Sequence, residues 1–144
     1  MGRGRHVLAL ARAGCRAFGV DQRLDAVRDA REEARAAGLA INVWVADLTA
    51  APLPRSAFDL IVVTRYLQRD LFPTLRDALK PGGVLVYETF TVRQRERGSG
   101  PTSAAYLLEE GELAGYFSGF DVVFYEETLS PEAVARLVAR KPSA

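Results

Sequence analysis

Residues 58–64 of the chain read FDLIVVT, a run that is apolar at nearly every position. A strand with this pattern is covered on both faces, as the strands of a parallel sheet are. Further apolar runs at 41–46 (INVWVA) and 84–90 (VLVYETF) alternate with helix-like stretches of about 10–15 residues. This alternation predicts crossover units, and hence a doubly wound α/β fold in one domain over residues 1–144.

Capping and stop signals give the bounds of the other elements. We expect Gly38 to end one helix, Asp70 to cap the start of another, and the Lys80–Gly83 turn to stop it. The expected helices cover residues 4–13, 24–37, 70–79 and 107–117, and the other strands cover 16–20 and 120–126.

The composition limits the classes of function. Apolar residues make up 49% of the chain, which suffices for a core. The net charge of +1 provides no general attraction to nucleic acid or to a membrane surface. The single cysteine, Cys15, cannot form an internal disulfide and fits a reducing cytoplasm. With one Cys and one His, the chain has no Cys/His metal cluster, and no apolar run approaches the roughly 20 residues of a membrane span.

Ligands of a doubly wound sheet bind beyond the carboxyl ends of its strands. At the first such position, Gly2-Arg3-Gly4 opens a helix, so the backbone can approach a ligand closely. Asp21 ends the next strand, near the roughly 20-residue spacing at which a carboxylate binds ribose hydroxyls. Ordinary turn chemistry at the glycines and a helix-capping role for Asp21 are the alternative interpretations.

Several further segments carry a resemblance to a known family. They are GRGRH at 2–6, GVD at 19–21, VADLT at 45–49, FDLIVVTRYL at 58–67 and LKPGGVLVYETF at 79–90. The chain resembles the class I S-adenosylmethionine-dependent methyltransferases, in particular small bacterial ones of the tellurite-resistance-like type. The helix–Pro-Gly-Gly–strand junction is the most specific element, and the match extends across nearly the whole chain.

The resemblance implies a Rossmann-like methyltransferase sheet, S-adenosylmethionine as cofactor, and methyl transfer to a small-molecule acceptor. It places the cofactor against Gly2 and Gly4, the cofactor ribose against Asp21, and the adenine beside Asp47, with Thr64 as a further cofactor residue. Asp47 has an alternative role, because a short acidic side chain also caps a turn such as 47–49.

The strand that ends at Thr64 leads toward the expected substrate. Arg65, Tyr66 and Glu88 are the substrate-side candidates, although Arg65 and Tyr66 also fit an ordinary loop. Enzymes that methylate DNA bases commonly have an Asn/Asp-Pro-Pro-Tyr-like turn where this chain has Thr-Arg-Tyr. Its absence argues against nucleic acid as a partner. The sequence identifies no catalytic residue.

The family's glycine loop follows a first strand, whereas only Met1 precedes it here. The resemblance therefore implies a sheet that lacks its central strand, between the strands that end at Asp21 and Thr64. A start codon assigned too late or a truncated chain is the simplest explanation. We expect the 144-residue form to bind S-adenosylmethionine weakly or not at all. A second copy that fills the gap would produce self-association.

The C-terminal stretch 129–142 carries two conflicting signals. Ser130, Pro131 and Glu132 are typical of a helix start. The members of the family, however, end in a strand that inserts antiparallel into the sheet. Residues 134–140 also alternate as a strand does. We therefore predict an antiparallel last strand over Val134–Arg140, because tertiary pairing commonly overrides local propensity.

Two other functions remain open from the sequence. An NAD-binding Rossmann protein would share the glycine turn, but Gly2-x-Gly4-x-x-Val7 lacks the third glycine. That interpretation also leaves the Pro81-Gly82-Gly83 junction unexplained. A non-catalytic methyltransferase-like fragment is compatible with the missing strand. Titration with S-adenosylmethionine and with NAD distinguishes these functions.

Overall fold

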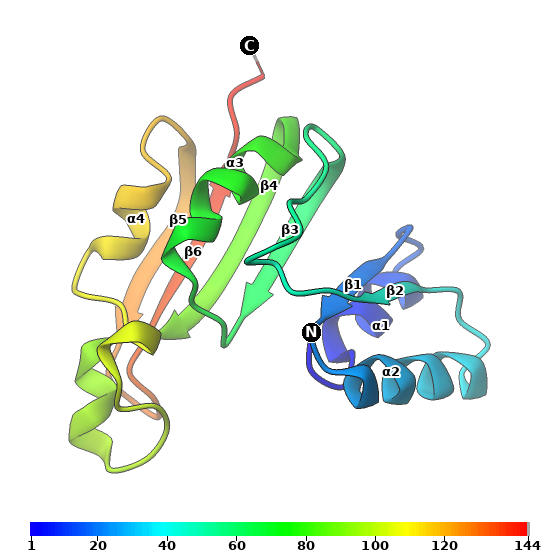
Figure 1. Ribbon diagram of the computed structural model, residues 1–144. Coiled ribbons are helices and arrows are strands. Elements are labelled where there is room, and N and C mark those ends of the chain that lie inside the picture. The colour runs from blue at the N-terminus through cyan, green and yellow to red at the C-terminus, as the bar shows by residue number, and fades with distance from the viewer. Residues whose placement is uncertain (144) are drawn as a thin grey trace. The chain divides into compact units, whose positions relative to one another are not determined.

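The computed structural model describes residues 1–143. The chain divides into two compact units, of which the first covers Met1–Pro52 and the second begins at Leu53 (Figure 1). Each unit has its own sheet and its own helices. No helix in residues 1–143 is both long enough and apolar enough to cross a membrane.

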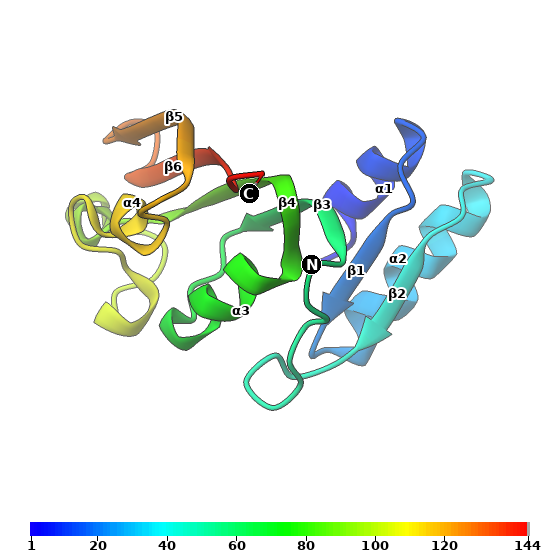
Figure 2. The same ribbon diagram turned by 90° about the horizontal axis from the view of Figure 1, so that it is seen from above.

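The first unit is a small parallel α/β layer. Its elements in chain order are α1 (Arg5–Arg12), β1 (Phe18–Asp21), α2 (Leu24–Ala36) and β2 (Asn42–Val45). The strands point the same way (Figure 2), with Phe18 opposite Asn42 and Asp21 opposite Val45. Because α2 connects two parallel neighbours, the unit is one crossover.

The core of the first unit lies between the helices and one face of the two strands. Its buried side chains come from both helices and both strand regions: Val7, Leu8, Ala17, Val27, Ala34 and Val43. Two of the six are alanine and none is aromatic, so the buried apolar volume is modest. The core is therefore compact and small.

The second unit is a mixed four-stranded layer. Its main elements in chain order are β3 (Phe58–Thr64), α3 (Phe72–Ala78), β4 (Leu79–Phe90), α4 (Glu112–Tyr116), β5 (Asp121–Thr128) and β6 (Val134–Arg140). Short 3-10 turns cover Arg69–Leu71, Val92–Arg97 and Ala104–Tyr106. The strand order is β3-β4-β6-β5, with β3 and β4 parallel and the other pairs antiparallel.

One face of this sheet packs under α3 and α4 (Figure 2). Leu85 and Tyr87 on β4 and Leu137 on β6 are buried there, following the two-residue period of a strand. Phe72 of α3 stacks on Tyr116 with ring centroids 4.0 Å apart. Long strands and aromatic packing thus give the second unit a large core of its own.

The structure confirms the α/β Rossmann-like fold and the antiparallel last strand, whose bounds Val134–Arg140 are those predicted. The strands form two sheets rather than one, and neither β1 nor β3 has a second neighbour among residues 1–143. This is the arrangement expected where the central strand is absent from the described residues. Ser130 and Pro131 lie in the turn before β6.

Four local predictions were wrong. Residues 80–83 do not form a separate turn, because α3 already ends at Ala78 and β4 begins at Leu79. Asp70 caps no helix: it lies in the Arg69–Leu71 turn, and α3 begins after Leu71 without a side-chain cap. The helix expected over 107–117 is reduced to Glu112–Tyr116, because Leu108 pairs with Thr91 in a β-bridge. The strand at 58–64 is not covered on both faces. It lies at the edge of its sheet, and Leu60 is 37% exposed.

Candidate cofactor and substrate residues

The carboxylate of Asp21 lies at the carboxyl end of β1 and is surrounded by donors. Its Oδ2 accepts hydrogen bonds from the Met1 amino group at 3.1 Å and from the Gly2 N–H at 2.9 Å. Its Oδ1 accepts one from the Arg23 N–H at 3.0 Å. Burial alone would raise the pKa of Asp21, but these hydrogen bonds outweigh it and lower the pKa below its ordinary value. Asp21 is therefore a carboxylate at neutral pH.

The two glycines of the glycine turn, Gly2 and Gly4, both have a positive φ but differ in the space around them. Gly2 has a φ of 59°, and a Cβ there would meet nothing within 4 Å, so its backbone is open on that side. Gly4 has a φ of 87°, and a Cβ there would lie 2.7 Å from the Cβ of Ala30 on α2. Gly4 thus lets α1 begin directly against α2, while Gly2 lies at the Asp21 carboxylate.

Asp47 follows β2 and forms a local turn. Its Oδ1 accepts hydrogen bonds from the Thr49 N–H at 2.9 Å and from the Thr49 hydroxyl at 2.6 Å. These bonds lower the pKa of Asp47 below its ordinary value. The capping role that the sequence offered as an alternative is therefore present. The other oxygen, Oδ2, has no hydrogen-bond donor within residues 1–143, which leaves it available to a ligand.

Two carboxylates of the first unit lie at the same end of its strands. Asp21 is the last residue of β1, Asp47 lies two residues after β2, and the two strands are parallel. A carboxylate offers about four lone-pair sites, of which Asp21 uses three. One ribose hydroxyl can therefore bind without displacing a donor, and a second must replace the Met1 amino group or a backbone N–H.

In the second unit the structure brings Thr64, Arg65 and Glu88 together. Thr64 lies opposite Glu88 in the β3–β4 pairing, and the Arg65 N–H donates to the Glu88 carbonyl at 2.9 Å. Arg65 has a φ of 55°, which is rare for a residue other than glycine. Its guanidinium lies 3.3 Å from Glu88 Oε1 and 4.5 Å from the Phe90 ring centroid.

The charges around Glu88 form a continuous network that the sequence did not reveal. Arg65 also pairs with Glu132 at 2.5 Å. Arg136 of β6 joins Glu88 at 2.5 Å to Glu126 of β5 at 2.8 Å. Arg136 lies opposite Glu88 in the β4–β6 register, and only that register could have identified the partnership. Because Arg65 is already paired with two carboxylates, it is a poor clamp for an anionic substrate.

Tyr66 is fixed at both ends. Its carbonyl accepts a hydrogen bond from the Tyr87 hydroxyl at 2.6 Å, and its own hydroxyl pairs with the Gln68 side chain. Burial raises the pKa of Tyr87, which keeps that donor protonated. Tyr66 is 40% exposed, so its ring remains accessible to a ligand while its backbone is held by the core.

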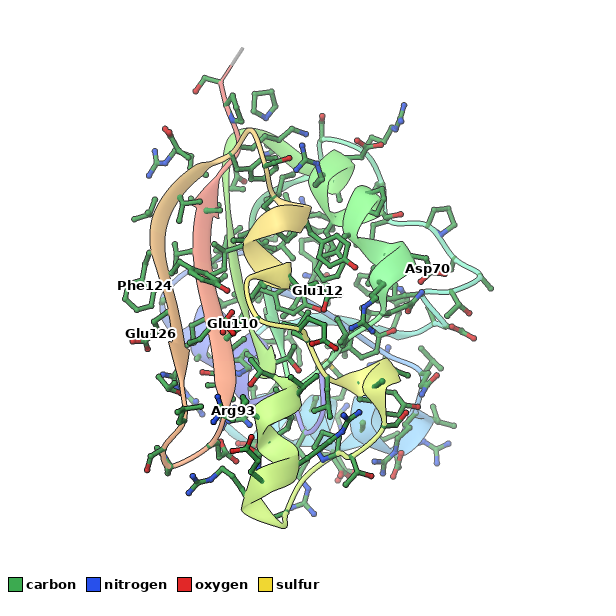
Figure 3. All side chains as sticks on the ribbon, turned by 90° about the vertical axis from the view of Figure 1, so that its left-hand side faces the viewer. Asp70, Arg93, Glu110, Glu112, Phe124 and Glu126 are labelled. Atoms are coloured by element: carbon green, nitrogen blue, oxygen red, sulfur yellow. The ribbon has the colours of Figure 1, made fainter. Side chains whose placement is uncertain are left out.

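A second ionic cluster supports α4 and was also missed. Arg69 holds Glu112 through two hydrogen bonds, Nε to Oε1 at 2.5 Å and Nη2 to Oε2 at 3.1 Å. The Tyr116 hydroxyl donates to the same Oε1 at 3.0 Å. Glu112 is labelled in Figure 3. The hydrogen bonds from Arg69 lower the pKa of Glu112. Among the described residues, no group of three or more His, Cys, Asp or Glu could hold a metal ion.

Comparison with known proteins decides the family. A family model described as a methyltransferase domain matches residues 1–83, which is more than half of the chain. The chain belongs to the methyltransferase domain family. This assignment confirms the predicted class of enzyme at the level of the family. No curated protein sequence matches the chain.

Solved structures show the same fold. TehB from Haemophilus influenzae superposes with a TM-score of 0.82 at 21% identity, over 97% of this chain and 55% of TehB. S-adenosylmethionine-dependent methyltransferases from Mesorhizobium loti and Methanosarcina mazei give TM-scores of 0.77 and 0.76, at 21% and 20% identity. They are matched over 97% and 99% of this chain and over 87% and 90% of their own. The chain thus spans about half the length of TehB.

Proposed function

We propose that the chain transfers a methyl group from S-adenosylmethionine to a small-molecule acceptor. The observation that carries the proposal is the ionised Asp21 carboxylate at the end of β1, in contact with the open backbone of Gly2. Asp47 flanks the adenine in this proposal, and Thr64 remains a cofactor residue. The two units form one methyltransferase domain. That is supported by the family match to residues 1–83, which crosses the boundary at Leu53.

Methyl transfer from a sulfonium depends mainly on how the protein orients the two reactants. When bound, S-adenosylmethionine supplies a methyl group already activated on a sulfonium. Asp21 and the glycine turn hold the nucleoside end, which fixes the direction of approach. Orientation and exclusion of water can together contribute about 7–11 kcal/mol to the rate. We assign no general base among the described residues.

The substrate-side residues favour an acceptor other than a strong anion. Arg65 is compensated by Glu88 and Glu132, and the network contains one carboxylate more than it has guanidinium groups. The exposed ring of Tyr66 offers an apolar surface. A small neutral or cationic acceptor is therefore better matched to this surface than a phosphate.

The NAD alternative finds less support. A third glycine of the dinucleotide motif would replace Val7, and Val7 is part of the core of the first unit, 3% exposed. A glycine there would leave a cavity instead of a close approach of helix and strand. A non-catalytic role is favoured by one observation, the engagement of Asp21 with three donors of the chain itself.

Cofactor choice is tested with the single tryptophan of the chain, Trp44, which lies on β2 three residues before Asp47. S-adenosylmethionine, S-adenosylhomocysteine and NAD are titrated while tryptophan fluorescence is recorded. We expect a weak but saturable change with the first two and none with NAD. Saturation with NAD alone would establish the dinucleotide alternative. No response to any of the three would favour the non-catalytic fragment.

A further inference from the structure

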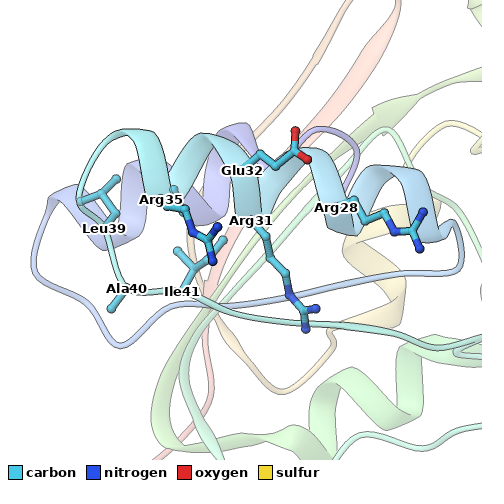
Figure 4. A pocket seen from close by; sticks show the side chains of 8 residues that line it. Arg28, Arg31, Glu32, Arg35, Leu39, Ala40 and Ile41 are labelled. Carbon is cyan, nitrogen blue, oxygen red and sulfur yellow. The ribbon is translucent and has the colours of Figure 1, made fainter.

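A hollow in the first unit lies away from the carboxyl ends of the strands. It is bounded by the later turns of α2 and by the segment 39–41 that leads into β2 (Figure 4), and its volume is about 600 Å³. The helix contributes Arg28, Arg31 and Arg35 to the lining, and the segment contributes Leu39 and Ile41. The hollow thus has one basic side and one apolar side.

The basic side carries uncompensated charge. Spacings of three and four residues place the three arginines on one side of α2. None of them forms an ion pair in the described part of the chain, whereas Arg23 on the preceding turn pairs with Asp25. Glu32 also lines the hollow, but Figure 4 shows its carboxylate directed away from the segment that Arg31 and Arg35 face.

The row of arginines contains two pairs of like charges, Arg28 with Arg31 and Arg31 with Arg35. Like charges three and four residues apart destabilise a helix by a few tenths of a kcal/mol each, and Glu32 offsets part of this through its spacing from Arg28 and Arg35. Arg31 is also fixed, because its Nη2 donates to the Val43 carbonyl at 2.9 Å on the outer edge of β2. That bond uses one of the five N–H groups of the guanidinium and orients the others.

The apolar side is continuous with the core. Leu39 and Ile41 are half-buried and pack against the core of the first unit. Their remaining surface faces the hollow together with Ala40. Water in contact with this wall is released when an apolar group covers it.

We propose that this hollow binds a small organic anion. Its carboxylate or phosphate group lies between Arg31 and Arg35, and its apolar body lies on Leu39 and Ile41. The guanidinium fork matches the planar or tetrahedral oxygens of such a group. A neutral apolar molecule would leave the arginines without a partner, and an inorganic ion would leave the wall exposed. The hollow is within the usual volume of ligand sites, roughly 300–1,000 Å³.

The site is separate from the cofactor residues of the same unit. Ile41 precedes β2, whereas Asp47 follows it, so the hollow and the carboxylates lie at opposite ends of that strand. The proposal therefore extends beyond methyl transfer. Its test does not depend on S-adenosylmethionine.

Hexyl phosphate, inorganic phosphate and 1-hexanol are the matched probes. Each is titrated into isotopically labelled protein, and the amide signals of residues 28–41 are followed by NMR. We expect saturable shifts with hexyl phosphate, and affinities at least tenfold lower for the two partial probes. Equal affinity for hexyl phosphate and inorganic phosphate would refute the proposed contact of the apolar body with Leu39 and Ile41. The absence of saturation with hexyl phosphate would refute the proposed site.

Two variants with the same change of charge locate the binding. Arg35→Gln removes a guanidinium from the hollow, and Arg12→Gln removes one from α1 of the same unit. We expect R35Q to weaken hexyl phosphate binding at least fivefold and R12Q to change it less than twofold. Equal losses would show general attraction to a basic surface and contradict the proposal. Arg28→Gln replaces R35Q if the latter fails to fold by circular dichroism.

Discussion

The two units of the chain differ in how much structure supports their strands. The strands of the first unit are four residues long, and Phe18 and Val45 on them are 39% and 45% exposed. The second unit contains a strand of 12 residues, β4, in which alternate side chains are buried. A two-stranded sheet is marginal without helices against it. Gly2, Asp21 and Asp47, which we propose bind the nucleoside of the cofactor, therefore lie in the less well supported unit.

The two units also treat their carboxylates differently. Asp21 in the first unit is held by backbone N–H groups and an amino group. Glu88 in the second unit is held by two guanidinium groups. Backbone donors remain in place when a ligand hydroxyl approaches, whereas paired side chains neutralise each other. We therefore expect Asp21 to contact a ligand, and Glu88 to hold the strands of the second unit together.

The largest expected effect is the destabilisation of one core without the other. Leu137→Ala removes a fully buried side chain from the second unit and should lower its free energy of unfolding by about 2–5 kcal/mol. Trp44 lies in the first unit, so tryptophan fluorescence reports that unit and far-UV circular dichroism reports both. We expect urea unfolding of L137A to shift by circular dichroism and to remain unchanged by fluorescence.

Leu8→Ala is the matched change in the first unit, where Leu8 is 1% exposed. It should shift the fluorescence transition instead. Equal shifts of both probes in both variants would show a single cooperative core, and the comparison between the units would lose its energetic basis.

The next effect concerns the glycine turn. Gly4→Ala forces a Cβ to within 2.7 Å of Ala30 and places alanine at a φ of 87°. We expect a loss of about 2–3 kcal/mol in the free energy of unfolding of the first unit. Gly14→Ala is the control, because φ is 85° there and a Cβ would meet nothing within 4 Å. It should cost only about 1 kcal/mol. Similar losses would mean that contact with α2 contributes nothing.

A smaller effect is expected for the proposed ribose contact. Asp21→Ala should weaken S-adenosylmethionine binding by about 1–3 kcal/mol, the range for hydrogen bonds to a charged group. Asp29→Ala removes an exposed carboxylate from α2 in the same unit and should leave the affinity unchanged. Calorimetric titration compares them. An unaltered affinity in D21A would refute the ribose role.

The smallest effect is a pH dependence in the second unit. Because the pKa of Glu112 is lowered from its ordinary value of 4.5, its pairing with Arg69 stabilises the fold at neutral pH. That stability is lost as the pH falls below this value. Glu112→Gln should cost about 1 kcal/mol near neutral pH, since the pair is only partly buried. The free energy of unfolding of E112Q, measured at several acidic pH values, should therefore fall less with decreasing pH than that of the wild type. An unchanged acid dependence would rule out this pair as its source.

The sequence predicted elements whose signals agree with tertiary pairing. Residues 134–140 alternate as a strand and pair on both sides, which overrides the helix signals before them. Asp70 was misassigned because a 3-10 turn, which shares helix-start signals, precedes α3. The helix at 107–117 was overextended because Leu107 and Leu108 are apolar for burial beside Thr91 rather than for a helix face.

Asp21 and Gly2 could be predicted as neighbours because the strand-end rule and a single spacing bring them together. The network around Glu88 could not be predicted in this way. Arg136 reaches it through the register of β6 against β4, and no spacing in the sequence encodes that register. Glu132 lies in the turn before β6 and reaches the network through Arg65. The hydrogen bond from the Met1 amino group to Asp21 was also missed, because Met1 precedes any recognisable element.

The central claim is that the end of the first unit binds the nucleoside of S-adenosylmethionine. Amide shifts measured by NMR during titration with S-adenosylmethionine test it residue by residue, and they detect weak binding. We predict the largest shifts in the first unit at Gly2, Asp21 and Asp47, all of them diminished in Asp21→Ala and retained in Asp29→Ala. Shifts confined to residues 28–41 or to the network around Glu88 would contradict the account.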